Sequence, residues 1–175
     1  MEILIFRHAE RLSSPLGFGT LQPLNSEFSG PPLSPRGVGQ ARQLAQSVSN
    51  QRLPLPKTLW CSPKLRAYQT FRSLSEAVGL PIIAVQGLDE REDNESPHDF
   101  RQRISSVLDK SVAQQGPVYM VSHQDWVEEC LFKIPSDADL TAEKYQSWAP
   151  GQYIHFEIEN KLWKLKQFGV LNARS

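Results

Sequence analysis

Short apolar runs alternate along this chain with longer segments in which apolar residues recur at helical spacing. Four of the runs have the length and composition of buried strands: residues 2–6, 58–61, 81–85 and 117–121. Two later runs, residues 153–158 and 162–168, flank the turn-like residues 159–161. Two strands joined by so short a connection predict a hairpin at the end of the chain.

Three helices are predicted by a shared start signal, a serine followed by proline. The serine hydroxyl can cap the first free N–H groups of a helix, and proline fits the first helical position. The pairs are Ser34-Pro35, Ser62-Pro63 and Ser96-Pro97. An apolar stripe follows each pair: Val38, Ala41, Leu44, Ala45 and Val48 after the first, Leu65, Tyr68, Phe71, Leu74 and Val78 after the second, and Phe100, Ile104, Val107, Leu108 and Val112 after the third. A shorter helix is predicted from near Gln124 to about Phe132.

This alternation of strand and helix predicts an α/β fold. The expected architecture is a three-layer sandwich, with a mostly parallel central sheet, helices on both faces and a C-terminal antiparallel hairpin. A chain of 175 residues is long enough to bury a core without disulfides or metal, so we expect residues 1–175 to form a single domain.

Charge and cysteine usage narrow the classes of partner. Lys and Arg number 19 and Asp and Glu also 19, so no overall field favours nucleic acid or an anionic membrane. No apolar run approaches a membrane span, and the N-terminus lacks the features of a signal peptide. Cys61 and Cys130 lack metal-ligand spacing and are expected as free thiols. We therefore expect a cytoplasmic protein whose attraction for any phosphorylated substrate comes from a local cluster of cations.

Basic and imidazole side chains follow three of the predicted strands. The first strand runs into Arg7 and His8, the second is followed by Arg66, and the fourth leads to His123. Ligands of parallel α/β sheets bind beyond the carboxyl ends of the strands. These four side chains are therefore expected to converge on one edge of the sheet.

Such a cluster suits phosphoryl transfer. A neutral imidazole is a competent nucleophile near pH 7, because its reference pKa is about 6.5. Two guanidinium groups can bind phosphoryl oxygens with paired donors, and a protonated second histidine adds charge and a further donor. The N-terminus of the helix after Ser62 could contribute backbone N–H groups. No metal or other cofactor is required for this chemistry.

Four segments together resemble the histidine phosphatase superfamily, also called the phosphoglycerate mutase-like family. Residues 7–10 (Arg-His-Ala-Glu) resemble its Arg-His-Gly-Glu signature, and residues 33–41 resemble its Leu-Thr-x-x-Gly-x-x-Gln-Ala segment. Residues 62–70 match its Ser-Pro-x-x-Arg-Ala-x-Gln-Thr segment closely, and Ser122-His123 stands where the family places its second histidine. The order and spacing of these motifs are kept from Met1 to about Phe132.

The resemblance implies a role for each matching residue. His8 would be the nucleophile that forms a phosphohistidine, with Arg7, Arg66 and His123 binding the phosphoryl oxygens. Glu90, in the segment Leu88-Asp89-Glu90, corresponds to the family's proton donor. Glu90 also lies in an acidic run, so a solvated loop remains an alternative, with Asp89 and Glu92 as substitute acids. Ser14 stands where relatives often have an asparagine that contacts phosphate.

Departures from the family pattern bear on the substrate. Ala9 replaces the usual glycine, Gln124 follows His123 where glycine is common, and Ser14 weakens or removes one phosphate contact. Few residues separate Glu90 from the next helix, where larger relatives carry an insertion that covers the site. This compactness disfavours a mutase of small metabolites and resembles the small bacterial phosphohistidine phosphatases, although the loop from Leu12 to Pro32 could fold over the site.

The sequence thus predicts a metal-independent phosphatase acting on phosphomonoesters or phosphohistidine. Its substrate would be a phosphorylated small molecule or a phosphoprotein. The alternative from another class is a non-catalytic protein of the same fold that binds phosphate or phosphopeptides. Neither reading involves nucleic acid or a membrane.

Overall fold

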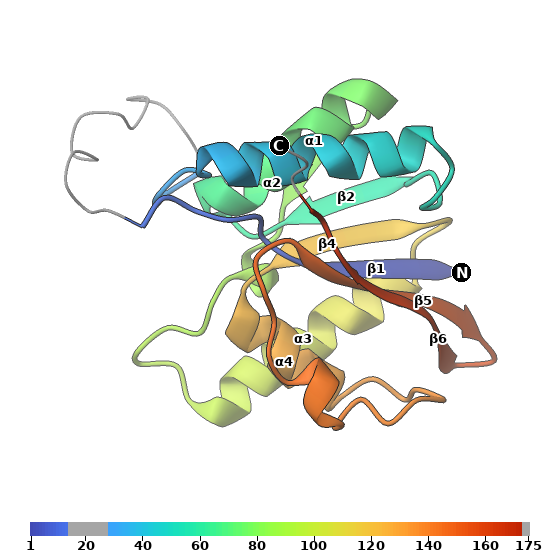
Figure 1. Ribbon diagram of the computed structural model, residues 1–175. Coiled ribbons are helices and arrows are strands. Elements are labelled where there is room, and N and C mark those ends of the chain that lie inside the picture. Colours follow the sequence, from blue (N-terminus) through green and yellow to red (C-terminus); the bar gives the residue numbers. More distant parts are fainter. Residues whose placement is uncertain (14–27, 173–175) are drawn as a thin grey trace.

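One six-stranded sheet forms the centre of the protein, in the strand order β3-β2-β4-β1-β5-β6 (Figure 1). The computed structural model describes residues 1–13 and 28–172. The strands are β1 (Glu2–Arg7), β2 (Thr58–Cys61), β3 (Ile82–Ala84), β4 (Val118–Ser122), β5 (Gln152–Glu159) and β6 (Leu162–Val170). β1 to β4 pair in parallel, whereas β5 is antiparallel to both β1 and β6. The predicted α/β class with a mostly parallel sheet and an antiparallel C-terminal hairpin is confirmed.

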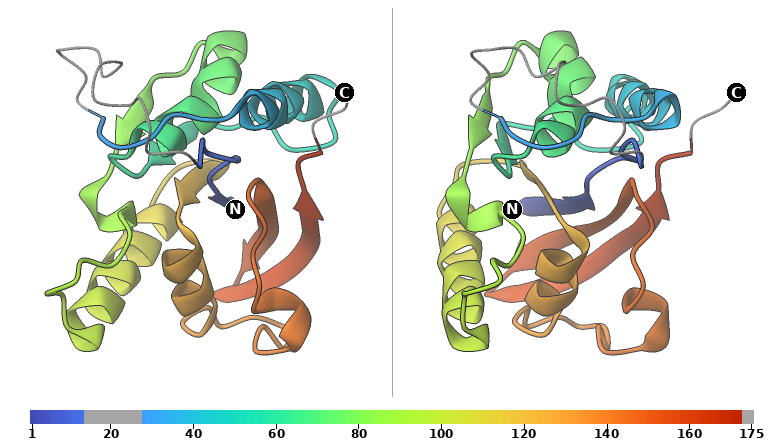
Figure 2. Two further views of the ribbon diagram at one scale, coloured as in Figure 1. Left: turned by 60° about the vertical axis from the view of Figure 1, so that its left-hand side comes forward. Right: turned by 90° about the vertical axis from the view of Figure 1, so that its left-hand side faces the viewer.

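Helices cover both faces of this sheet (Figures 1 and 2). The elements are α1 (Pro35–Ser49), α2 (Leu65–Val78), α3 (Pro97–Val112) and α4 (Gln124–Leu131), with short 3-10 turns η2 (Gln86–Leu88) and η3 (Glu143–Tyr145). In Figure 1, α1 and α2 lie on one face, and α3 and α4 lie on the other. The predicted three-layer arrangement is therefore present. Within the described residues, no helix is long and apolar enough to cross a membrane.

The central strand β1 divides its side chains between two cores. Leu4 and Phe6 pack with residues of α1 and α2, whereas Ile3 and Ile5 pack with residues of α3 and α4. All four are fully buried, because successive side chains of a strand point to opposite faces and both faces are covered. An apolar run in a central strand is the expected result.

Two of the three serine-proline pairs begin helices as predicted. The Ser34 hydroxyl accepts a hydrogen bond from the Gly37 N–H, and the Ser96 hydroxyl accepts one from the Asp99 N–H. The predicted start at Ser62 is wrong, because α2 begins at Leu65 and Lys64 occupies the N-cap position without a side-chain cap. The Ser62 hydroxyl instead contacts His123 and Asp89.

The hairpin forms as predicted, with Asn160 and Lys161 in its turn at φ values of 50° and 68°. The helical stripes are narrower than predicted, because Val38 and Val112 are among the exposed apolar side chains. On α1 the buried face includes Gly37 and Gln40 in addition to apolar residues. Polar and glycine positions therefore belong to this core face, which hydrophobic periodicity does not reveal.

Candidate active site

Three neighbouring parallel strands end side by side. Arg7 at the end of β1 is in register with Ser122 of β4, and Cys61 of β2 is in register with Val121 of β4. The ladder continues one step further, with His8 N–H donating to the Ser122 carbonyl and Ser62 N–H to the Val121 carbonyl. His8, Ser62 and His123 thus leave the sheet at one edge, which is where the sequence placed the candidate chemistry.

His8 is held with one ring nitrogen engaged. Its Nδ1 lies 2.8 Å from the Ala9 carbonyl oxygen, so Nδ1 carries the proton and donates. In the described part of the chain, Nε2 makes no hydrogen bond and keeps its lone pair for attack. The rings of His8 and His123 are 5.3 Å apart between centroids. Only 5% of the His8 side chain and backbone surface is exposed.

Burial sets the protonation state of His8. Desolvation is the main cause that lowers its pKa to about 3; the bond to the Ala9 carbonyl raises it, and the charges of Arg66, Arg7 and Arg11 lower it further. The imidazole is therefore neutral across the physiological range. A neutral ring with a free Nε2 is the form that a nucleophile requires.

Arg66 connects three groups of the site. Its Nη2 lies 3.0 Å from Nδ1 of His123 and 2.8 Å from a carboxylate oxygen of Glu90. The guanidinium is almost fully buried, and its Nε has no partner among the described residues. Gly30 lies against it, because a Cβ there would be 3.2 Å from Nη1. The structure thus brings Arg66 and His123 together.

Arg7 is held by a hydrogen bond from its Nη1 to the Trp148 carbonyl. Its Nε is buried without a partner in the described residues. Burial is the main cause that lowers the Arg7 pKa, opposed by the charge of Glu128. Each of the two arginines thus has one N–H donor, on Nε, without a partner among the described residues, and guanidinium donors of this kind can bind an anion's oxygens.

The three candidate acids lie in different surroundings. Glu90 is ion-paired with Arg66 and its side chain is 44% exposed, so it faces both the site and solvent. Asp89 is buried, and its oxygens are occupied by the Ser62 hydroxyl, the Glu90 N–H and Lys64. Glu92 is exposed on the following loop. Of the three, Glu90 alone combines a contact with Arg66 and access to an incoming group.

The loop that carries Glu90 is fixed by Arg103 of α3. This guanidinium donates to the carbonyls of Gly87 and Asp89 and is ion-paired with Glu95 at 2.7 Å. The acidic run is thus not simply a solvated loop. Nothing in the sequence pattern indicated this role for Arg103.

Two motif residues hold the backbone around His8. The Thr70 hydroxyl accepts from the Ala9 N–H at 3.0 Å and donates to the Arg66 carbonyl at 2.7 Å. The Gln40 amide accepts from the Glu10 N–H and donates to the carbonyls of Pro150 and Leu171. Both residues stand in the quoted motifs, which is the signal that could have identified them.

The departures from the family pattern have different outcomes. Ala9 is buried and has no positive φ, so its methyl group causes no backbone strain. Ser14 lies outside the described residues, as does most of the loop from Leu12 to Pro32. At the described end of that loop, Phe28 stacks on Tyr68 of α2, and the Ser29 carbonyl accepts from the Leu65 N–H.

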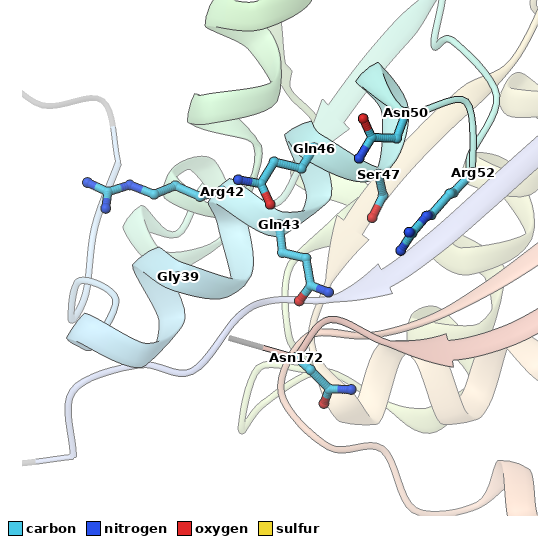
Figure 3. A pocket seen from close by; sticks show the side chains of 8 residues that line it. All are labelled: Gly39, Arg42, Gln43, Gln46, Ser47, Asn50, Arg52 and Asn172. Carbon is cyan, nitrogen blue, oxygen red and sulfur yellow. The ribbon is translucent and has the colours of Figure 1, made fainter. Parts of the chain in front are cut away.

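A separate polar pocket of about 310 Å³ lies along α1 (Figure 3). Its lining residues are polar or glycine: Gly39, Arg42, Gln43, Gln46, Ser47, Asn50, Arg52 and Asn172. In Figure 3 the Arg42 side chain points away from the others. Among the candidate site residues that the structure describes, none lines this pocket.

The family follows from comparison with known proteins. A sequence model of the histidine phosphatase superfamily (branch 1) matches residues 3–94, which is more than half of the chain. The chain therefore belongs to the histidine phosphatase superfamily. None of the curated protein sequences compared with it matches significantly.

Solved structures share the fold at low sequence identity. An Escherichia coli protein proposed to be an alpha-ribazole-5'-P phosphatase is 20% identical, with a TM-score of 0.73 over 98% of this chain and 96% of that one. An Agrobacterium tumefaciens protein proposed to be the phosphohistidine phosphatase SixA is 17% identical, with a TM-score of 0.71 over 97% of both chains. A mutant Entamoeba histolytica phosphoserine phosphatase in complex with phosphoserine is 14% identical, with a TM-score of 0.66 over 95% of both chains.

Proposed function

We propose that this protein is a metal-independent phosphatase that hydrolyses phosphomonoesters or phosphohistidine through a covalent phosphohistidine on His8. The observation that carries the proposal is the state of His8. Its ring is neutral, its proton is held on Nδ1 by the Ala9 carbonyl, and Nε2 is free among the described residues. The His123 ring lies 5.3 Å from the His8 ring, and the charges of Arg66 and Arg7 act on His8, which supports these three residues as the ones that would bind the phosphoryl group.

The reaction has two steps. Nε2 of His8 attacks phosphorus while the bond to the leaving oxygen or nitrogen breaks, and Glu90, after taking up a proton from solvent at its exposed side, gives that proton to the leaving group. Water then attacks the phosphohistidine, the P–N bond breaks, and Glu90 takes a proton from the water. Arg7 and Arg66 stabilise the charge spread over the phosphoryl oxygens in both transition states.

Three solved structures that share this fold are named for an alpha-ribazole phosphate, phosphohistidine and phosphoserine. Their variety supports a phosphorylated substrate without favouring one leaving group. A phosphohistidine leaving group needs less protonation than an alcohol, so it depends less on Glu90. A small-molecule mutase stays the less favoured alternative, because the segment between Glu90 and α3 is short.

The test is the release of p-nitrophenol from p-nitrophenyl phosphate, with a chelator present, by wild type and His8→Ala. Wild type is expected to turn over, and His8→Ala to lose at least about a thousandfold in kcat, as removal of a covalent nucleophile does. Acid-labile, alkali-stable labelling of the wild type by a phosphorylated substrate would show the phosphohistidine directly.

His98→Ala is the matched control, because His98 is an exposed histidine at the start of α3. It should retain wild-type turnover. Activity that is unchanged in His8→Ala would contradict the proposal. Saturable phosphopeptide binding without hydrolysis of any substrate class would instead support the non-catalytic alternative.

A further inference from the structure

A buried chain of hydrogen bonds runs behind the second histidine. His123 Nε2 lies 2.7 Å from the Ser62 hydroxyl, which lies 3.2 Å from an oxygen of Asp89. Exposed fractions are 3% for His123, 0% for Ser62 and 6% for Asp89. The other Asp89 oxygen is ion-paired with Lys64 at 3.3 Å. The chain thus leads from the site to a buried carboxylate.

The donors and acceptors in this series of hydrogen bonds allow one arrangement of protons. A guanidinium can only donate, so Nδ1 of His123 accepts from Arg66 and carries no proton. The neutral ring therefore has its proton on Nε2, which donates to the Ser62 oxygen. A carboxylate only accepts, so the single Ser62 proton goes to Asp89. Every proton in this series of hydrogen bonds has an acceptor.

This arrangement has a consequence when a phosphoryl group enters. Arg66 turns its donors to the phosphoryl oxygens, and Nδ1 of His123 is left with a lone pair facing an anion. That contact is repulsive unless Nδ1 takes a proton and becomes a donor. The imidazolium then formed would be buried, and a buried charge requires a nearby opposite charge.

We propose that Asp89 is a positioning residue that acts through Ser62, fixing the proton of free His123 on Nε2 and stabilising its imidazolium when a phosphoryl group is bound. Only the second part of this inference, the stabilisation of the imidazolium, rests on the proposed function. It gives Asp89 a part in the reaction without contact with the substrate. The logic is that of a carboxylate that orients an imidazole, here with a hydroxyl between the two.

The charges facing His123 come from several elements. Arg66 and Lys64 lie at the start of α2, Asp89 and Glu90 on the loop after η2, and His8 at the end of β1, next to Arg7. In the free protein, burial is the main cause that lowers the His123 pKa to about 2, and the charge of Arg66 adds to it. His123 is therefore neutral until an anion arrives.

The experiment reads the ring nitrogens of His123 by ¹⁵N nuclear magnetic resonance at pH 7, in free protein and with saturating orthovanadate as a phosphoryl analogue. The chain has four histidines, so His123→Gln assigns the signal. Free wild type should show a neutral ring protonated on Nε2. The vanadate complex should show both nitrogens protonated.

Asp89→Asn keeps an acceptor for Ser62 but removes the charge. In its vanadate complex, the pH at which His123 loses its second proton should fall by about one unit or more. The alkaline limb of the kcat profile should shift by a similar amount. The matched control is Asp93→Asn, which removes an equal charge from an exposed position on the same loop and should shift neither value.

The outcomes separate this inference from the proposed function. A proton on Nδ1 in the free wild type, a neutral ring in its vanadate complex, or equal shifts in Asp89→Asn and Asp93→Asn would overturn the role of Asp89. Loss of turnover in His8→Ala would leave the proposed function standing in each case. If Asp89→Asn does not fold, Ser62→Ala breaks the same chain, and the two wild-type measurements need no variant.

Discussion

Gly37 meets the backbone of Glu10 so closely that no side chain fits between them. A Cβ at this position would lie 2.0 Å from the Glu10 carbonyl oxygen. The first turn of α1 is thereby pressed against the residues that follow His8, where the Ser34 N–H donates to the same Glu10 carbonyl at 2.9 Å. At the residue scale, the position of the backbone after His8 depends on the absence of one carbon atom at Gly37.

Gly37→Ala should lower the free energy of unfolding by about 3 kcal/mol, because a backbone group must move to admit the methyl group. Urea denaturation followed by circular dichroism measures it. Gly79→Ala is the control: its Cβ meets nothing within 4 Å, and its φ of 71° costs only about 1–2 kcal/mol. An equal loss in the two variants would contradict the steric argument.

At the scale of elements, one side chain joins α1 to both ends of the C-terminal hairpin. Gln40 is almost fully buried, and its three hydrogen bonds reach Glu10 after β1, Pro150 before β5 and Leu171 after β6. The Gly151 N–H in turn donates to the His8 carbonyl. These hydrogen bonds thus join α1, the backbone at His8 and the C-terminal hairpin at one place.

Gln40→Leu should lower the free energy of unfolding by about 2–4 kcal/mol, because it leaves a buried N–H and two carbonyls without a partner. Gln46→Leu, at an exposed position on the same helix, should change it by less than about 0.5 kcal/mol. Chemical denaturation of the two variants beside wild type provides the measurement. Similar losses in both would contradict the role of the three Gln40 hydrogen bonds.

Elements marked by an apolar run or by apolar residues at helical spacing can be predicted from the sequence. β2 was predicted at its observed bounds, and the convergence of the strand ends followed from parallel pairing alone. The start of α2 could not be predicted from residue type. Serine often caps a helix, but the Ser62 hydroxyl forms a tertiary contact with His123. Contacts such as Arg103 with the Glu90 loop join residues distant in sequence and leave no periodic signal.

At the scale of the whole molecule, the buried histidines link folding to pH. Burial lowers the pKa of His8 to about 3 and of His123 to about 2, whereas both titrate near 6.5 when unfolded. The unfolded chain therefore binds more protons below pH 6.5. Their contribution to stability is complete above that pH and is lost as the pH falls toward the folded-state values.

The free energy of unfolding should accordingly fall between pH 6.5 and pH 5, with a slope that rises toward about 1.4 kcal/mol per pH unit for each of these two histidines. Urea titrations at half-unit intervals of pH test this. His8→Asn should reduce the slope, because one of the two protons is no longer taken up on unfolding. A stability that does not change over this range would contradict the protonation states assigned to the site.

The place of β1 in the sheet has a consequence for synthesis. β1 lies between β4 and β5, so during synthesis it can pair with these neighbours only when both of them have emerged from the ribosome. Pairing between strands so far apart in sequence is slow, because the entropic cost of closing the loop comes before the contacts that compensate for it. A nascent chain therefore carries His8 without its surroundings until both β4 and β5 have been synthesised.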